Sequence, residues 1–390
     1  QDVATRAAKL GVERFVLDDG WFKNRDGDTK ALGDWTPDPR KYPHGLTPLI
    51  DHVRTHGMEF GLWVEPEMIN PDSDLARAHP EWIMREQDRP PLLQRHQLVL
   101  DLTQTAVADH LFATLSGLLS ANAIGYLKWD MNRDLTEAAP DGRFVNRTYV
   151  HALYALIDRL RAAHPDVEIE TCASGGGRCD YGILARTDRV WVSDSNDALD
   201  RLAINRGAAR FLPLRVMGTH VGPAKCHITG RRLGLDLRAH VALFGAFGLE
   251  FDVRDLTARE EERLAAHIAN YKKHRALIHD GRYRRIETHE RDHAADAVVA
   301  RDGGEALLRV VRTGSAQLGR DVTIRLPGLD PAARYRMSAL RPLNASVELS
   351  LAPALAAGEL TLNGAALEAI GLPLWLPRPE TSLVLHLERI

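Results

Sequence analysis

The sequence predicts an α/β fold in which strand–helix units build a (β/α)8 barrel, followed by a smaller antiparallel β-domain. Short apolar runs alternate with amphipathic helical patterns from Arg14 to about Val253. Polar or charged residues follow each run, as expected at the active-site face of a parallel barrel. Beyond about Gly281 the pattern changes to short alternating strands separated by Gly, Pro and Asp. That pattern is typical of an antiparallel β-sandwich.

Seven apolar runs are predicted to be parallel strands, whereas a closed (β/α)8 barrel needs eight. The count is one short at the N-terminal end, so we expect this chain to lack the first barrel strand. A helix from Thr257 to Ile278 is expected to close this region. The predicted strands are Arg14–Leu17, Glu59–Val64, Gly125–Trp129, Val167–Thr171, Arg189–Val192, Leu214–Gly218 and Gly248–Phe251.

The change of pattern predicts two domains. Residues 1–280 are expected to form the barrel and residues 281–390 the antiparallel β-domain. Strands of the second domain are predicted at Ala306–Val311, Asp321–Leu326 and Ser382–Leu387.

Composition narrows the classes of protein to consider. The chain has 390 residues, 44% hydrophobic and 26% charged, with a formal net charge of −3 and both signs interspersed. No nucleic-acid or membrane partner is indicated, and the apolar runs are shorter than the roughly 20 residues that span a bilayer. Cys172, Cys179 and Cys226 are too few and too irregular for a disulfide framework or a zinc site. The low cysteine count favours the cytoplasm.

Two acidic clusters follow the first two predicted strands. Asp18 and Asp19 precede Trp21, and such a group suits a sugar, because carboxylates accept hydrogen bonds from hydroxyls while an indole packs against apolar ring faces. The alternative is an acidic first turn of a helix. Glu65 and Glu67, taken alone, read better as solvated acids of a loop.

The third cluster has the strongest chemical pattern. Lys128, Asp130 and Asn132 alternate with apolar residues, so a period of two places them on one face of a strand. A half-exposed strand with a polar outer face would show the same pattern. Barrel strands are covered on both sides, so we expect these side chains to point into the site. Lys128 would favour an ionised Asp130, as a nucleophile requires.

Two further clusters follow later strands. The glycines at 175–177 allow close approach of the backbone to a ligand, but the segment lacks the lysine of a P-loop. Cys172 has no partner histidine at motif spacing and is interpreted as a small wall residue. Asp197 is expected to cap the following helix, which leaves Asp194, nearer the strand end, as the catalytic candidate.

Two carboxyl groups on one barrel face match the requirement of glycoside hydrolysis, which needs an ionised carboxylate and a protonated carboxylic acid. Asp130 and Asp194 lie after different strands of the same predicted face.

Seven ordered motifs between about Gly11 and Asp280 together resemble glycoside hydrolase family 36 α-galactosidases. The β-rich tail resembles the C-terminal domain of that family more loosely. The motifs are LDDGWF (17–22), LGDW (32–35), WVEPEMINPDSDL (63–75), QLVLDL (97–102), KWDMNR (128–133), CASGGGR (172–178) and WVSDSND (191–197).

The resemblance implies a (β/α)8 barrel and a retaining double displacement with no metal or organic cofactor. Asp130 matches the nucleophile and Asp194 matches the general acid/base of the family. A retaining enzyme should hold these two carboxyl groups roughly 5–5.5 Å apart, whereas an inverting one needs about 6.5–9.5 Å. Positions that match the lining of the galactose pocket are Asp18, Asp19, Trp63, Arg95, Lys128, Asn132, Cys172 and Gly175.

The sequence departs from the family pattern at His96, where asparagine is common, and this bears on the contacts around Arg95. Family members also carry an N-terminal β-domain, which supports a tetramer, and a first barrel strand; we expect both to be missing here. An α-N-acetylgalactosaminidase and a raffinose-synthase-type galactosyl transferase are enzymatic alternatives. A non-catalytic, incomplete fragment is the alternative from another class.

Overall fold

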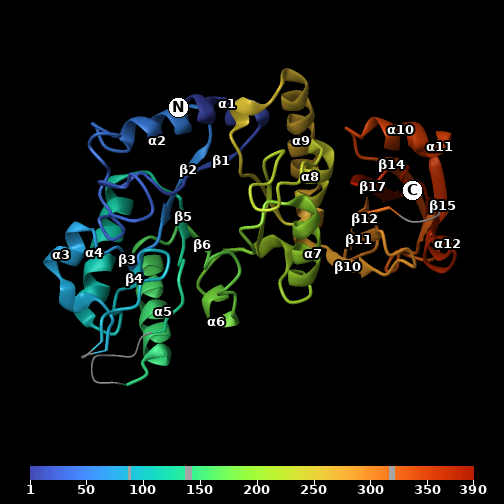
Figure 1. Cartoon of the computed structure of the whole chain (residues 1–390). Coiled ribbons are helices and arrows are strands. Elements are labelled where there is room, and N and C mark those ends of the chain that lie inside the picture. Colours follow the sequence, from blue (N-terminus) through green and yellow to red (C-terminus); the bar gives the residue numbers. More distant parts are fainter. Residues whose placement is uncertain (87–88, 137–142, 316–320) are drawn as a thin grey trace. The chain divides into compact units, whose positions relative to one another are not determined.

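A computed structural model describes residues 1–86, 89–136, 143–315 and 321–390 (Figure 1). The described chain divides into two compact units. The first contains residues 1–8 and 12–194, and the second contains residues 9–11 and 195–390. No helix in the described part of the chain has the length and apolar character needed to cross a membrane.

The first unit contains five parallel strands in the order β1-β2-β5-β6-β7. A short antiparallel pair, β3 and β4, lies outside this sheet. The parallel strands coincide with predicted runs, to within one residue at each end. The bounds are β1 (Arg14–Leu17), β2 (Glu59–Val64), β3 (Met68–Ile69), β4 (Leu98–Val99), β5 (Tyr126–Trp129), β6 (Glu168–Thr171) and β7 (Arg189–Trp191).

Helices between these strands bury their apolar positions at helical spacing. In α4 the leucines Leu111, Leu115 and Leu119 recur every four residues and are buried, and α4 packs against α5. Buried residues of these two helices share one hydrophobic core with apolar residues of the parallel strands, such as Leu62 and Leu127. The helices of this unit are α1 (Asp2–Leu10), which begins in it, α2 (Thr47–Thr55), α3 (Asp74–Ala78), α4 (Thr105–Ala121), α5 (Asn146–Ala163) and α6 (Tyr181–Leu184).

The second unit begins with further strand–helix elements. Strands β8 (Met217–Val221) and β9 (Ala246–Leu249) pair in parallel. The helices are α7 (Ala198–Ala208), α8 (Leu235–Ala242) and α9 (Ala258–Asp280). Thr257 caps α9 through a capping box with Glu260, which fixes its start one residue from the prediction.

The remainder of this unit is antiparallel, as predicted. A six-stranded sheet has the order β10-β11-β12-β17-β14-β15, and β13 pairs with β16 in a separate ribbon. Side chains from both, including Val310 and Val322, share one hydrophobic core. The bounds are β10 (Arg282–Ile286), β11 (His293–Val299), β12 (Glu305–Arg312), β13 (Val322–Ile324), β14 (Arg334–Ala339), α10 (Ala345–Ser350), α11 (Pro353–Ala356), β15 (Leu360–Asn363), α12 (Gly364–Ala369), β16 (Leu372–Leu374) and β17 (Thr381–Arg389).

These elements confirm the α/β class with a C-terminal antiparallel region, and they correct the positions of two parallel strands. The seventh strand was predicted at Gly248–Phe251 and is Ala246–Leu249, two residues earlier at each end. The sixth parallel strand was predicted at Leu214–Gly218, but residues 214–216 form a 3-10 turn and the strand is Met217–Val221. Pro213 stands directly before this turn, with no N–H to donate to a ladder. The division of the chain into domains at residue 280 stays a prediction.

Candidate active site

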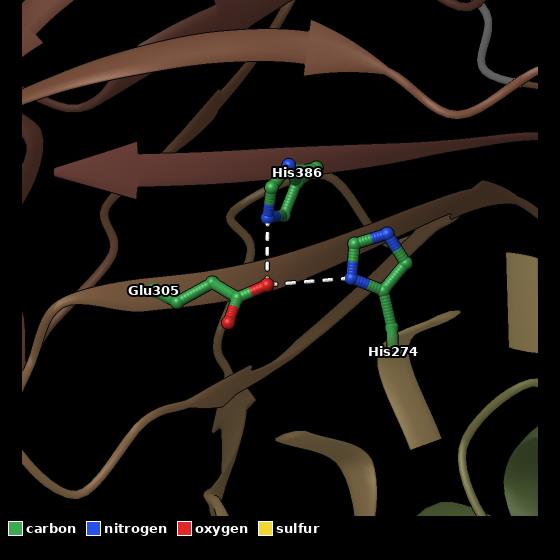
Figure 2. A group of neighbouring side chains, drawn as sticks. All are labelled: His274, Glu305 and His386. Atoms are coloured by element: carbon green, nitrogen blue, oxygen red, sulfur yellow. Dashed lines mark hydrogen bonds and ion pairs between the residues drawn. The ribbon is translucent and has the colours of Figure 1, made fainter. Parts of the chain in front are cut away.

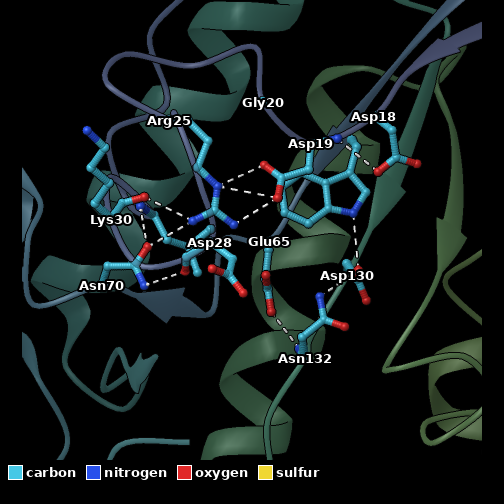
Figure 3. Close-up of polar contacts among 12 residues, drawn as sticks. Asp18, Asp19, Gly20, Arg25, Asp28, Lys30, Glu65, Asn70, Asp130 and Asn132 are labelled. Atoms are coloured by element: carbon cyan, nitrogen blue, oxygen red, sulfur yellow. Dashed lines mark hydrogen bonds and ion pairs between the residues drawn. The ribbon is translucent and has the colours of Figure 1, made fainter. Parts of the chain in front are cut away.

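The parallel strands of the first unit bring polar residues to one edge of the sheet, because the carboxyl ends of parallel strands lie on the same side. Asp18 follows β1, Glu65 follows β2, Asp130 follows β5 and Cys172 follows β6. Asp194 comes three residues after the end of β7. Figure 3 shows side chains from the first three of these strand ends, with Asp130, Asn132 and Glu65 close together.

The Asp130 carboxylate is 7% exposed and accepts hydrogen bonds from three donors. The indole N–H of Trp63 and the amide of Asn132 donate to Oδ2, at 3.1 and 2.7 Å. The backbone N–H of Met131 donates to Oδ1 at 2.8 Å. Hydrogen bonds to an ionised acceptor are the strong ones, so this set fixes the carboxylate and stabilises its negative charge.

Asn132 connects Asp130 to the rest of the site. Its side-chain oxygen accepts from the guanidinium of Arg95 at 2.9 Å and from the hydroxyl of Ser174 at 3.3 Å. Its backbone N–H donates to Glu65 at 2.5 Å. Because two donors point at the side-chain oxygen, the amide nitrogen must face Asp130. Arg95 itself has a φ of 52°, a strained value for a residue with a side chain.

Glu65 is buried, so its interpretation as a solvated loop acid is wrong. It is 1% exposed, and its second carboxyl oxygen accepts from the amide of Gln97 at 3.1 Å. Burial, together with the nearby charge of Asp130, raises the pKa of Glu65 to about 8. Glu65 is therefore protonated near neutral pH, and it adds no second negative charge beside Asp130.

Glu67 is also buried, but its charge is compensated by an ion pair. Arg178 donates to Oε1 at 2.7 Å, and the indole N–H of Trp129 donates to the same oxygen at 2.9 Å. The hydroxyl of Tyr149 donates to Oε2 at 3.2 Å. Glu67 thus holds Trp129, the residue directly before Asp130. The signal that could have revealed both glutamates is the apolar strand and Pro66 around them, which leave little room for solvent.

Lys128 forms an ion pair with Asp18 at 2.8 Å, and its ammonium group lies 5.9 Å from the centre of the Trp191 ring. Burial lowers the pKa of Lys128, but the charges of Asp18 and Glu170 outweigh that effect and raise it overall. Asp19 makes a two-point contact with Arg25, whose Nε and Nη2 lie 3.0 and 2.8 Å from its two oxygens. Asp18 and Asp19 therefore each lie beside a fixed cation (Figure 3 shows the Asp19 pair).

The segment after β6 packs against the loop that carries Asp194. Gly175 has a φ of +86°, and a Cβ built on it would lie 2.7 Å from the Cα of Ser193. Only glycine tolerates both conditions. Cys172 is buried, and burial, together with the charge of Asp130, raises the pKa of its thiol. A thiol kept protonated fits a wall residue and not a nucleophile.

Asp194 is exposed, and its Oδ1 accepts from the indole N–H of Trp191 at 3.0 Å. That bond anchors the side chain to the last residue of β7, and the carboxyl group is accessible to solvent. Asp197, in the second unit, is the N-cap of α7 and accepts from the backbone N–H groups of Leu199 and Asp200. The predicted capping role of Asp197 is confirmed.

Two family models match the chain. The Melibiase model matches residues 1–281, and the model for the glycosyl hydrolase family 36 C-terminal domain matches residues 293–387. An α-galactosidase from Escherichia coli is 41% identical over 393 residues, covering 99% of this chain and 56% of the relative. The α-galactosidase AgaA from Geobacillus stearothermophilus is 40% identical over 349 residues, covering 87% and 48%. The chain thus spans about half the length of these relatives.

Solved structures give the same result for the fold. The GH36 α-galactosidase AgaA from G. stearothermophilus matches all of this chain and 53% of its own, with a TM-score of 0.92 and 36% identity. A variant of AgaA in complex with raffinose has a TM-score of 0.92 and 35% identity over the same shares.

We predict that Glu65 makes stability depend on pH between 4.5, its ordinary pKa, and about 8. The folded protein binds the Glu65 proton more tightly than the unfolded chain does. The contribution of this proton to the free energy of unfolding is therefore complete below pH 4.5 and is lost as the pH rises towards 8. Relative to wild type, Glu65→Gln should gain stability over this range, by at most about 1.4 kcal/mol per pH unit. Urea denaturation at a series of pH values measures the difference.

Glutamine is a suitable replacement, because the Oε1 of Gln97 is buried without a partner in the described chain and can accept from the new amide after a flip. Glu359→Gln, at an exposed glutamate, is the matched control and should follow the wild-type curve. Parallel curves for Glu65→Gln and wild type would contradict the raised pKa.

Proposed function

This chain belongs to the Melibiase family, and from that premise we propose that it hydrolyses terminal α-linked galactosides, such as melibiose and raffinose, with retention of anomeric configuration. The observation that carries the proposal is the Asp130 carboxylate, which is fixed by three hydrogen-bond donors at the end of β5. A carboxylate held in one orientation with its charge stabilised is suited to attack an anomeric carbon.

In the proposed reaction, Asp194 protonates the glycosidic oxygen while a carboxylate oxygen of Asp130 attacks the anomeric carbon. The bond to the leaving alcohol breaks, and a covalent galactosyl ester forms on Asp130. Asp194, now ionised, takes a proton from water, and the resulting nucleophile cleaves the ester to release galactose and restore Asp130. Asp194 suits this exchange because its carboxyl group is accessible and is held by Trp191 through one oxygen.

The residues around Asp130 supply the proposed sugar contacts. Asp18 and Asp19 keep free acceptor capacity for hydroxyl groups, because their cations, Lys128 and Arg25, leave lone pairs on the carboxylate oxygens. Trp63 offers an apolar ring beside the nucleophile, although its N–H is engaged by Asp130. A protonated Glu65 carries no negative charge, so it does not repel the Asp130 carboxylate in the free enzyme.

The family resemblance also implies that the substrate-cleaving protein is a homotetramer. Light scattering after size-exclusion chromatography would measure this state directly.

Asp130→Ala should abolish hydrolysis of p-nitrophenyl α-galactoside, because it removes the carboxylate that forms the ester in the proposed reaction. We expect the rate to fall by at least about 10⁴-fold, the scale seen when a nucleophile is removed. Asp109→Ala removes an exposed carboxylate of α4 that is paired with Arg159, and serves as the control with wild-type activity. Activity is measured from released p-nitrophenol, and folding from circular dichroism.

Wild-type-like activity in a folded Asp130→Ala protein would overturn the assignment of the nucleophile. Cleavage of p-nitrophenyl α-N-acetylgalactosaminide in preference to the galactoside would instead select the N-acetylgalactosaminidase alternative.

Asp194→Ala should separate substrates by the quality of their leaving groups. p-Nitrophenolate departs without a proton, whereas the sugar alcohol of raffinose needs one. We therefore expect the rate of raffinose hydrolysis to fall by about 10²–10⁴-fold. The rate at which the nitrophenyl substrate transfers galactose to Asp130 should fall much less. A pre-steady-state burst of p-nitrophenol measures that first step, and galactose release from raffinose is assayed in parallel. Equal losses on both substrates would argue against Asp194 as the acid.

A further inference from the structure

Three side chains in the second unit converge from elements that are far apart in the sequence. His274 comes from α9, Glu305 from the start of β12 and His386 from β17. Figure 2 shows the two imidazole rings facing one carboxylate oxygen of Glu305 from different sides. None of the three belongs to the site around Asp130, and the proposed hydrolysis does not use them.

The donor atoms have the spacing of metal ligands. Nδ1 of His274 and Nε2 of His386 lie 3.3 and 2.8 Å from Oε1 of Glu305, and the three atoms lie within 4.8 Å of one another. Zinc binds imidazole nitrogen and carboxylate oxygen at about 2.0–2.2 Å, which separates tetrahedral ligand atoms by about 3.3 Å. Two imidazoles and one carboxylate are also a common protein ligand set for zinc.

Burial gives this cluster a closed base and an open side. The side chain of His274 is 2% exposed, that of His386 is 14% exposed and that of Glu305 is 39% exposed. An ion could therefore enter from solvent and keep a water molecule as its fourth ligand. The open side also means that His386 and Glu305 can be substituted with little disturbance to the core.

The ring of His274 is oriented so that Nδ1 faces the cluster. Its other nitrogen, Nε2, is buried and has no hydrogen-bond partner in the described chain. Lys273 places a positive charge near His274, which opposes the binding of a cation. Glu388 lies near Lys273 and is paired with Arg336.

We propose that His274, Glu305 and His386 form a binding site for a divalent transition-metal ion of the zinc class. The bound ion ties helix α9 to strands β12 and β17, so its role is to stabilise this unit. Without an ion, the same groups form a hydrogen-bond network in which one carboxylate oxygen accepts from both rings. In the first state the three side chains bind an ion, and in the second they bind one another. Titration with a metal ion distinguishes the two states.

The test uses the whole protein, purified without a histidine tag and stripped with a chelator. Isothermal titration with Zn²⁺ should give one saturable equivalent in the wild type. His386→Ala and Glu305→Gln should each weaken this binding by at least about tenfold, because each removes one of three protein ligands. His289→Ala, at an exposed histidine of the same unit, is the matched control and should bind like the wild type.

X-ray absorption on the wild-type zinc complex provides a readout that does not depend on the variants. The expected first shell contains two imidazole nitrogens with oxygen ligands completing it. Absence of saturable binding, retention of full affinity in both folded variants, or a shell without imidazole would each overturn the proposal. Because the wild-type spectrum is decisive alone, failure of a variant to fold does not leave the proposal untested.

Discussion

The hydrogen bonds that hold the Asp130 carboxylate depend on the pairing of β2 with β5. Trp63 lies opposite Lys128 in that register, and the backbone N–H of Asp130 continues the pairing by donating to Val64 at 2.8 Å. The indole of Trp63 thereby reaches the carboxylate from the neighbouring strand, while Asn132 reaches it from the same loop. A slip of one residue would turn Trp63 to the other face of the sheet and remove its bond. The register is therefore the constraint on which the site depends.

A second constraint is the electrostatic cost of crowding carboxyl groups at buried strand ends. The structure meets it in two ways. Glu67 is paired with Arg178 and accepts two further hydrogen bonds, from Trp129 and Tyr149. Among the residues that the structure describes, no cation is in hydrogen-bonding contact with Glu65, and burial raises its pKa, so it keeps a proton instead. Asp130 can then carry the one charge that the proposed chemistry needs in the centre of this group.

The sequence predicts those features that local pattern determines. The parallel strands appear as short runs rich in apolar residues, bounded by helical patterns, and the capping role of Asp197 can be predicted from its position before a helix. Contacts between strands are not encoded locally, so the burial of Glu65 and the ion pair of Lys128 with Asp18 could not be read from spacing. The predicted start of the sixth parallel strand was wrong for a similar reason. A 3-10 turn has the same apolar residues as a strand end, and only pairing distinguishes them.

The central claim is that Asp130 forms a covalent bond with the sugar, and trapping that ester tests it most directly. A 2-fluoro-substituted α-galactosyl donor with a good leaving group slows hydrolysis of the ester, so that it accumulates. Mass spectrometry of the digested protein should then find one fluorogalactosyl label on the peptide that contains Asp130. A label on Asp194, or an unlabelled enzyme that releases β-galactose, would contradict the account.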